Sequence, residues 1–246
     1  MLAVLIFLKE LFDLAITTVL FDLDGTLLPQ DQDVFLKSYF RHLVKKLASH
    51  GYDPDLTVKA IWRCTEAMIN NDGSCTNEQA FWRDFAKMCG DHVINDIPVF
   101  DDYYRNEFQQ VATDCGFNPK AGECIAALRQ KGFRLALATN PLFPAIATES
   151  RMRWAGLNRE DFALYTTYEN SRYCKPNLDY YRDILKQLNV RPEECLMVGN
   201  DVSDDMVARE LGMQVFLLTD CLINKSDVDI AQYPHGSFDE LMAFIG

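Results

Sequence analysis

The chain has 246 residues, enough for one or two domains of about 150 residues and for a large buried core. Hydrophobic residues make up 48% of it and charged residues 24%, which excludes a disordered or collagen-like chain. The 36 Asp and Glu against 24 Lys and Arg give a formal net charge of −12. Such a charge repels nucleic acid and anionic membranes, so we expect neither as a partner. A small anionic substrate stays compatible with it, because local positive groups can outweigh the overall charge.

Eight cysteines are scattered along the chain without a C-x-x-C pair, so the spacing of a zinc ribbon or a redox motif is absent. We therefore expect reduced, mostly buried thiols in a cytoplasmic protein.

The N-terminal extension, residues 1–16, begins with the unbroken apolar run 1–8. That run is shorter than the roughly 20 residues of a membrane span, and it lacks the preceding basic segment of a secretory signal. It can be a short amphipathic helix packed on the domain or on another chain, or an addition upstream of the domain. Membrane association is a third, disfavoured interpretation.

Short apolar runs in the rest of the chain predict buried β-strands, each ended by a polar or turn segment. These runs cover residues 17–21, 133–138, 162–167, 195–198 and 214–218. Helical patterns lie between the later runs, at 121–131, 178–188 and 203–211. This alternation predicts an α/β fold with a Rossmann-like, doubly wound parallel sheet covered by helices on both faces.

Residues 29–115 interrupt the alternation. Mostly helical patterns follow one another there, over 33–49, 55–70, 77–89 and 98–115. The simplest account is a helical insertion between the first strand and its crossover helix. The sequence thus predicts a catalytic core of residues 17–28 and 116–246 and an inserted helical cap domain of residues 29–115.

Polar residues follow the first, second and fourth predicted strands. They are Asp22 and Asp24, Thr139 and Asn140, and Asn200, Asp201, Asp204 and Asp205. In such sheets ligands bind outside the carboxyl ends of the strands, so the three clusters should meet at one edge. Carboxylates crowded in this way repel one another, and oxygen-only ligands favour Mg²⁺ as the balancing cation. Lys175, shortly after the third strand, can bring a positive charge to the same edge.

A site of this composition is suited to phosphoryl transfer. A carboxylate can attack a phosphoryl group to form an aspartyl-phosphate, while a metal ion screens the repulsion between the two anions. A second carboxylate two residues further on can protonate the leaving oxygen and later deprotonate water. A Thr hydroxyl, backbone amides and a Lys can hold the remaining phosphate oxygens.

The segment Phe21-Asp22-Leu23-Asp24-Gly25-Thr26-Leu27 resembles the first motif of the haloacid dehalogenase-like (HAD) superfamily. Thr139-Asn140, Lys175-Pro176 and Gly199-Asn200-Asp201-Val202-Ser203-Asp204-Asp205 resemble its second, third and fourth motifs, in the same order. The resemblance covers about residues 17–28 and 116–246, and the insertion is similar in position to the family's first-type cap. The chain resembles the phosphatase branch, in particular the phosphoglycolate phosphatases.

The resemblance implies roles for the acidic residues. Asp22 would be the nucleophile and a metal ligand. Asp24 would be the general acid and base, with its backbone carbonyl on the metal. Asp201 would be the third protein ligand of Mg²⁺.

The resemblance also implies supporting roles around these three residues. Thr139 and the amide of Asn140 would bind the phosphoryl group, and Lys175 would neutralise Asp22 and the phosphate. Asp205 would orient the ligand shell or Lys175. Asp204 is interpreted as an acidic residue at the start of a helix rather than as a ligand.

We therefore expect a Mg²⁺-dependent phosphatase that cleaves a small phosphate monoester, a phosphorylated metabolite, through an aspartyl-phosphate. A phosphomutase of the same superfamily shares this core chemistry, and a non-catalytic phosphate-binding regulatory protein could keep the pocket. A dehalogenase is disfavoured, because that branch needs neither the acid at Asp24 nor Mg²⁺.

The cap should carry the specificity. Trp62, Arg63, Trp82 and Arg83 are suitable residue types for contacting a small phosphorylated metabolite. The alternative is that the tryptophans are core residues and the arginines lie on a solvated face. No motif names the ester, and the sequence leaves open whether the chain forms a homo-oligomer.

Overall fold

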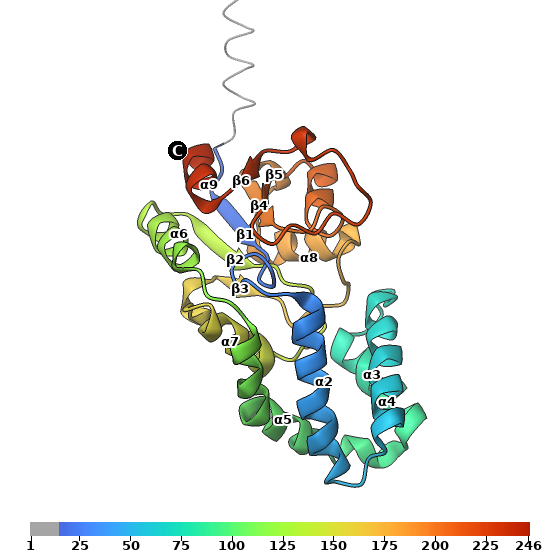
Figure 1. The fold of residues 1–246 in the computed structure, drawn as a ribbon. Helices are drawn as coiled ribbons and strands as arrows, with labels where there is room; N and C mark the ends of the chain where they lie inside the picture. Colours follow the sequence, from blue (N-terminus) through green and yellow to red (C-terminus); the bar gives the residue numbers. More distant parts are fainter. Residues whose placement is uncertain (1–14) are drawn as a thin grey trace, which may run out of the picture.

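The central element of the fold is a six-stranded parallel sheet with the strand order β3-β2-β1-β4-β5-β6 (Figure 1). The computed structural model describes residues 15–246, so residues 1–14 of the predicted N-terminal extension lie outside the described residues. The strands are β1 (Thr18–Phe21), β2 (Arg134–Leu137), β3 (Leu164–Tyr165), β4 (Cys195–Gly199), β5 (Gln214–Leu218) and β6 (His235–Gly236). This sheet confirms the predicted α/β fold class.

Both faces of the sheet are covered, which explains why its central strands are apolar throughout. Val19 and Phe21 of β1 point into one apolar cluster, and Leu20 between them points into the other. The first cluster packs against α6 (Pro119–Gln130) and α9 (Phe238–Ile245). The second packs against α8 (Leu178–Leu188) and the 3-10 segment η5 (Met206–Leu211).

The register of the central strands brings three loops to one edge of the sheet. Phe21 at the end of β1 pairs with Leu137 at the end of β2 and with Val198 near the end of β4. The segments that follow these residues therefore leave the sheet at the same level. Those segments carry the three polar clusters predicted from the sequence.

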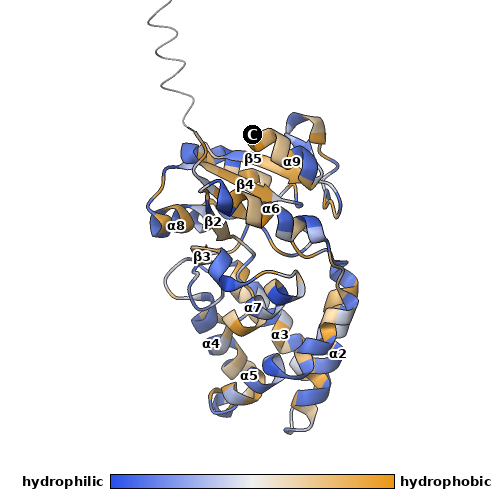
Figure 2. Ribbon diagram, turned by 90° about the vertical axis from the view of Figure 1, so that its left-hand side faces the viewer, coloured by the Kyte–Doolittle hydropathy of each residue, from blue (hydrophilic) through white to orange (hydrophobic). Residues whose placement is uncertain are grey.

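The chain between β1 and α6 forms a group of helices beyond this edge (Figure 1). They are α2 (Gln32–Ala48), α3 (Pro54–Ile69), α4 (Asn77–Cys89), η1 (Asp91–Ile94), α5 (Ile97–Arg105) and η2 (Glu107–Asp114). Their apolar faces enclose a separate core rich in aromatic rings, including Phe35, Phe85, Tyr103 and Phe108. Figure 2 shows the contrast with the sheet, since these helices alternate between hydrophobic and hydrophilic residues along their length.

Local sequence signals fix the ends of these helices. The Asp31 carboxylate accepts hydrogen bonds from the backbone amides of Asp33 and Val34 and so caps α2. Thr76 and Gln79 form a reciprocal capping box at the start of α4.

Backbone groups at two places help to join the helical insertion to the rest of the fold. At the first, Gln30 forms an antiparallel bridge with Cys115, and the Gly116 amide donates to the Pro29 carbonyl at 2.7 Å. At the second, the amide of Asn77 at the start of α4 donates to the Ser171 carbonyl at 2.9 Å. The domain boundaries at residues 28 and 116 stay a prediction.

Two predicted helices are different in the structure. Residues 98–115 are divided at Asn106, whose side chain donates to both the carbonyl and the carboxylate of Asp102 and so competes with the helical ladder. The predicted helix over 203–211 is a tight turn followed by η5, because the carboxylate of Asp201 accepts from the amides of Ser203 and Asp204.

Several elements had no sequence signal that we recognised. The sequence did not predict β6, α9 or α7 (Ala145–Trp154), nor the short segments η3 (Arg159–Asp161), η4 (Pro192–Glu194) and η6 (Ile230–Gln232). Of these, α7 matters most here, because it contributes a buried arginine to the site. Within residues 15–246 no helix is both long enough and apolar enough to cross a bilayer.

Candidate active site

The loop after β1 carries Asp22 and Asp24 on a tight turn. The Gly25 amide donates to the Leu28 carbonyl at 2.8 Å, and the Leu28 amide donates to the Leu23 carbonyl at 2.8 Å. Gly25 has φ +84°, and a Cβ atom there would collide with the side chain of Asn200. Only glycine therefore lets this loop approach the loop after β4 so closely.

Asp22, Lys175 and Asp205 form a buried ionic cluster at the edge of the sheet. Lys175 Nζ donates to Asp22 Oδ1 at 2.8 Å and to Asp205 Oδ1 at 2.6 Å, and its side chain is only 2% exposed. The other oxygen of Asp22 accepts from the Thr26 hydroxyl at 3.1 Å. Lys175, which lies 153 positions further along the chain, thus helps to hold the Asp22 carboxylate in one orientation.

The environment of this cluster alters the pKa values of its members. Burial by itself would lower the pKa of Lys175, but the nearby charges of Asp205 and Asp22 raise it well above its usual range, so the side chain stays a cation. Burial raises the pKa of the Asp205 carboxyl, against the opposing effect of Lys175. The cluster is therefore one cation shared by two carboxyl groups with little access to water.

The loop after β4 is organised around Asp201 and Asp205. Asp201 Oδ1 accepts from the amides of Ser203 and Asp204, at 2.8 and 3.0 Å, while the Asp201 amide donates to Asp205 Oδ2 at 3.0 Å. A side chain at Gly199 would occupy the place of the Asp205 carboxylate. Asp205 therefore points inward to Lys175, as a residue that orients Lys175 would, and Asp201 lies on the cavity wall.

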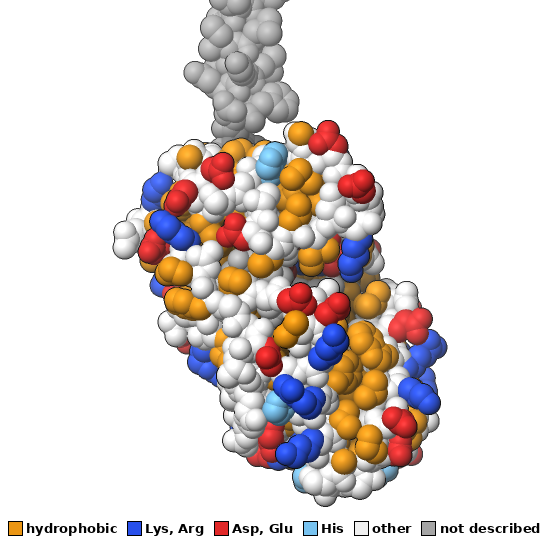
Figure 3. Space-filling view, viewed as in Figure 1, with side chains coloured by type: hydrophobic (Ala, Val, Ile, Leu, Met, Phe, Trp, Pro, Cys, Tyr) orange, Lys and Arg blue, Asp and Glu red, His pale blue; other side chains and the backbone are white. Residues whose placement is uncertain are grey.

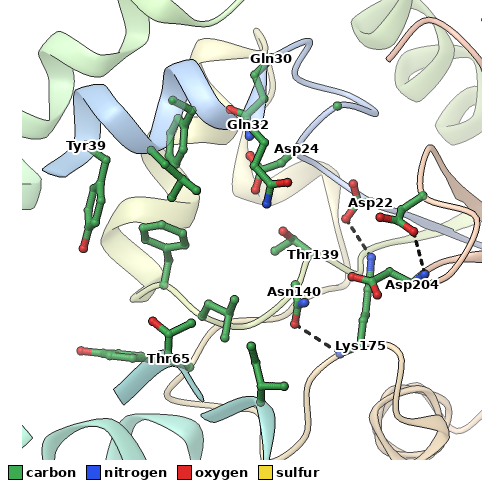
Figure 4. A pocket seen from close by; sticks show the side chains of 18 of the residues that line it. Asp22, Asp24, Gln30, Gln32, Tyr39, Thr65, Thr139, Asn140, Lys175 and Asp204 are labelled. Atoms are coloured by element: carbon green, nitrogen blue, oxygen red, sulfur yellow. Dashed lines mark hydrogen bonds and ion pairs between the residues drawn. The ribbon is translucent and has the colours of Figure 1, made fainter. Parts of the chain in front are cut away.

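The Asp204 carbonyl accepts from the Tyr181 hydroxyl at 2.6 Å, and burial raises the pKa of its carboxyl group. The structure places it in a turn and not at the start of an α-helix, which corrects our interpretation of this residue. Its side chain also lines the cavity (Figure 4).

Thr139 and Asn140 follow β2 and face the same cavity (Figure 4). The Thr139 carbonyl accepts from the hydroxyl groups of Thr166, at 2.6 Å, and Tyr180, at 2.8 Å, which fixes the backbone of this loop. The Asn140 side-chain oxygen accepts from the Lys175 amide at 3.3 Å. The loops after β2 and β3 are thereby tied to each other.

Asp24 forms an ion pair that the sequence did not suggest. One of its carboxylate oxygens accepts from Arg151, which is 1% exposed and lies on α7. The Arg151 guanidinium carbon also lies 4.6 Å from the centre of the Phe143 ring. The other Asp24 oxygen, Oδ1, is buried and accepts no hydrogen bond from the described residues. Burial raises the pKa of the Asp24 carboxyl, and Arg151 opposes this rise.

Sequence reasoning missed Arg151 because residues 145–154 carried no element prediction. The segment Arg151-Met152-Arg153-Trp154 contains two arginines. Only the fold shows that Arg151 is buried and Arg153 is exposed.

These loops form one end of a cavity of about 970 Å³, and side chains of the helical insertion form the opposite end. Asp22, Asp24 and Lys175 lie at the sheet end. Trp62 and Trp82 lie at the insertion end. The structure therefore brings all the sequence-predicted site residues to this cavity, since Thr139, Asn140 and Asp201 line it and Asp205 does so as well.

The two arginines considered with the tryptophans are not part of the cavity wall. Arg63 pairs with Glu66 and Arg83 pairs with Asp84, and the arginine side chains are 62% and 52% exposed. For the arginines, the alternative interpretation of a solvated face is the one that agrees with the structure.

The donors available to a metal ion are all oxygens. Two carboxylates, of Asp22 and Asp201, and the backbone carbonyl of Asp24 follow the ends of neighbouring strands. No group of three His, Cys, Asp or Glu side chains within residues 15–246 is arranged as a ready-made metal site. This donor set fits Mg²⁺, which keeps several waters and is held by one or two carboxylates together with substrate oxygens.

Comparisons with known proteins identify the family. The model of the haloacid dehalogenase-like hydrolases matches residues 16–212, so the chain belongs to that family. Phosphoglycolate phosphatase of Colwellia psychrerythraea is 25% identical over 203 residues, covering 82% of this chain and 83% of the relative. Pyrophosphatase PpaX of Bacillus cereus is 23% identical and covers 80% of each chain.

A solved structure has the same fold. The HAD phosphatase from Thermococcus onnurineus superposes with a TM-score of 0.58 at 19% identity, covering 94% of this chain and 98% of that one. The family and the similarity to phosphoglycolate phosphatases that the motifs predicted are both confirmed. With them, the predicted class of enzyme, a HAD-like phosphatase, is confirmed too.

Proposed function

We propose that the protein is a Mg²⁺-dependent phosphatase that hydrolyses a small phosphate monoester through an aspartyl-phosphate on Asp22. The observation that carries this proposal is the position of the Asp22 carboxylate. It is held by Lys175 and Thr26 at the sheet end of a cavity that Thr139 and Asn140 also line. A carboxylate fixed in this way is suited to attack one phosphorus atom in line with its ester oxygen.

In the first step Asp22 attacks phosphorus, and the bond from phosphorus to the ester oxygen breaks. Asp24, in its protonated form, gives its proton to the departing oxygen. Burial favours that protonated form, because it raises the pKa of the Asp24 carboxyl. Oδ1 of Asp24 accepts no hydrogen bond from the described residues, so this oxygen can carry the proton.

In the second step Asp24, now a carboxylate, takes a proton from water, and the water oxygen attacks the phosphorus of the aspartyl-phosphate. The bond from phosphorus to the Asp22 oxygen breaks, which regenerates the Asp22 carboxylate and releases inorganic phosphate. The Thr139 hydroxyl and the Asn140 amide bind phosphate oxygens in both steps, and Lys175 offsets the negative charge of the nucleophile and the phosphate. Asp205 keeps Lys175 in place through the 2.6 Å hydrogen bond. When bound by Asp22, Asp201 and the Asp24 carbonyl, Mg²⁺ would screen the repulsion between the two anions.

The test is release of inorganic phosphate from a panel of phosphate monoesters, with Mg²⁺ and with a chelator. Asp22→Asn should lower kcat by at least about a thousandfold while the variant stays folded. Asp24→Asn, given an activated ester such as 4-nitrophenyl phosphate, should accumulate a phosphoenzyme that mass spectrometry detects, because the base for hydrolysis is missing. Full activity of Asp22→Asn would show that another residue is the nucleophile.

The same panel separates the two alternatives. A phosphomutase would convert a sugar phosphate into its isomer with little inorganic phosphate. A phosphate-binding regulatory protein would bind phosphate and release none from any ester.

We also propose a cytoplasmic location, on the basis of the cysteines. All eight are free thiols, and burial raises the pKa of several of them, for example that of Cys174 to about 12. Thiols of this kind are unreactive and are typical of a reducing compartment.

A further inference from the structure

The insertion end of the cavity is built from aromatic and aliphatic side chains. Phe35 and Tyr39 of α2, Ile61 of α3, Trp82 of α4 and Phe100 of α5 line it, and each is less than 9% exposed. Figure 3 shows hydrophobic side chains gathered over the face between α2 and the helices α3 and α4. In Figure 4, Tyr39 and Thr65 lie across the cavity from Asp22 and Lys175.

The charges that line this cavity are unsuited to a second anionic group on the substrate. No Lys or Arg of residues 29–115, all of which the structure describes, is among the lining residues. The charged residues that this segment does contribute are Asp31, Asp33 and Asp101. The lining cations are Lys175, already bound by two carboxylates, and Lys225 on the sheet side. Arg151 lies behind the lining ring of Phe143, and its charge is already paired with Asp24. A carboxylate or second phosphate reaching the insertion would therefore be desolvated without a partner.

Uncharged polar groups are present. The hydroxyl groups of Tyr39 and Tyr104 lie 3.1 Å apart, and both residues line the cavity. Thr65, Gln30 and Gln32 add further uncharged polar groups to the wall. These groups can pair with a hydroxyl or ether oxygen of a ligand, so the wall accepts polarity but not charge.

The size of the cavity agrees with a bulky ligand. Its volume of about 970 Å³ lies near the upper end of the roughly 300–1,000 Å³ that is usual for small-molecule sites. A two-carbon ester would fill only the sheet end and leave the aromatic wall in contact with water.

We propose that the substrate is a phosphate monoester of a bulky, uncharged and largely apolar or aromatic alcohol. This inference rests on the proposed function and narrows it. It separates the chain from the activities that the names of its relatives state, because phosphoglycolate and pyrophosphate both carry a second anionic group.

The test compares esters of unactivated primary alcohols, so that the reactivity of the leaving group changes little. Ethyl, hexyl and 2-phenylethyl phosphate are assayed for phosphate release beside 2-phosphoglycolate and pyrophosphate, all with Mg²⁺. The expected kcat/KM rises by about fourfold for each methylene group that becomes buried, and is highest for the long and aromatic esters. It is at least about tenfold lower for 2-phosphoglycolate than for 2-phenylethyl phosphate.

A matched pair of variants tests the charge argument. Thr65 lines the cavity, whereas Thr113 is exposed outside it, and each hydroxyl donates to a carbonyl of its own helix at 2.9 Å. Thr65→Lys should shift the ratio of kcat/KM values at least about tenfold toward 2-phosphoglycolate. Thr113→Lys should leave the ratio unchanged.

A second variant tests the aromatic wall without adding charge. Trp62 is 50% exposed at the rim and its ring lies 5.4 Å from that of Phe40. Trp62→Ala should reduce the preference for 2-phenylethyl over ethyl phosphate several-fold, chiefly through KM.

The outcomes distinguish this inference from the proposed function. Preference for 2-phosphoglycolate or pyrophosphate over the apolar esters would overturn the inference and leave the phosphatase proposal intact. An unchanged ratio in a folded Thr65→Lys variant would also overturn it. Release of no phosphate from any ester would overturn the proposed function and this inference together.

Discussion

The sheet edge and the helical insertion form opposite ends of one cavity, but different interactions fix the side chains within each region. At the sheet edge, hydrogen bonds and ion pairs of 2.6–3.1 Å fix polar side chains one by one, as with Lys175, Asp22 and Thr26. In the insertion, packed rings form the wall, such as Trp82 and Phe100 with centroids 5.0 Å apart. Directional bonds suit the placing of reacting atoms, whereas a packed apolar wall suits the selection of a ligand by shape and polarity.

The largest effect on stability is expected at Lys175, whose removal leaves two carboxyl groups without their shared cation. Lys175→Met should lower the free energy of unfolding by about 3–5 kcal/mol at pH 8 and abolish activity. The loss should be smaller at pH 5. The pKa of the Asp205 carboxyl is already raised in the folded protein to about 7, so the folded state takes up a proton more readily than the unfolded state as pH falls.

Urea denaturation at the two pH values measures this difference. Lys186→Met, at an exposed position of α8, serves as the control and should be nearly neutral. Equal losses for Lys175→Met at pH 5 and pH 8 would contradict the idea of one cation shared by two carboxylates.

The next largest loss of stability is expected at Arg151. This loss is smaller than that at Lys175, because Asp24 retains partial contact with water when its partner is removed. The Asp24 side chain is 26% exposed, whereas that of Arg151 is 1% exposed. Arg151→Met should therefore lower the free energy of unfolding by about 2–3 kcal/mol, which is less than the decrease expected when the partner of a fully buried charge is removed. Thermal denaturation measures it, with the exposed Arg153→Met on the same helix as control. If the ion pair is the cause, the double variant Asp24→Asn, Arg151→Met is more stable than the sum of the single effects predicts.

A smaller loss of stability is expected where the start of α4 in the insertion contacts the loop after β2. We call this contact the junction between the two regions. The Asn77 side chain is fully buried and donates to the Pro141 carbonyl at 3.2 Å, next to the Asn140 loop. Asn77→Ala should lower the free energy of unfolding by about 1–3 kcal/mol. It should also speed hydrogen exchange at the Glu78 amide, which donates to the Tyr168 carbonyl. Asn95→Ala, at an exposed position of the insertion, should change neither. Unchanged exchange at Glu78 would mean that Asn77 does not hold this junction.

The smallest effect on stability is expected at Trp62. Because half of its surface is exposed, Trp62→Ala should lower the free energy of unfolding by less than about 1 kcal/mol. Chemical denaturation checks this value. A loss of more than about 3 kcal/mol, the range for a buried aromatic residue, would make Trp62 a core residue and weaken its assignment to the ligand wall.

The sequence was informative for the sheet edge for a physical reason. In open parallel sheets ligands bind outside the carboxyl ends of the buried strands, so the candidate site residues Asp22, Thr139 and Asp201 stand beside apolar runs that are visible in the chain. Their spacing within a motif is also local: Asp205 lies four residues after Asp201 and folds back to its amide. From such patterns the parallel sheet, most helices and the family could be predicted.

The sequence was uninformative where a residue's role depends on a distant partner. Arg151 and Arg153 stand two positions apart on α7, and only the packing of that helix against the loop after β1 buries the first beside Asp24. Trp62 and Arg63 are adjacent, yet one lines the cavity and the other pairs with Glu66 on the surface.

The amino-acid sequence alone therefore indicated the five longer strands, most of the helices, the motifs and the class of chemistry, because these depend on local periodicity and short spacings. Tertiary structure decided which side chains line the cavity, because aromatic residues that form a core and those that form a cavity wall have the same helical spacing. It also decided which charges are neutralised. Arg151 reaches Asp24 across 127 residues, and no property of either segment alone encodes that ion pair.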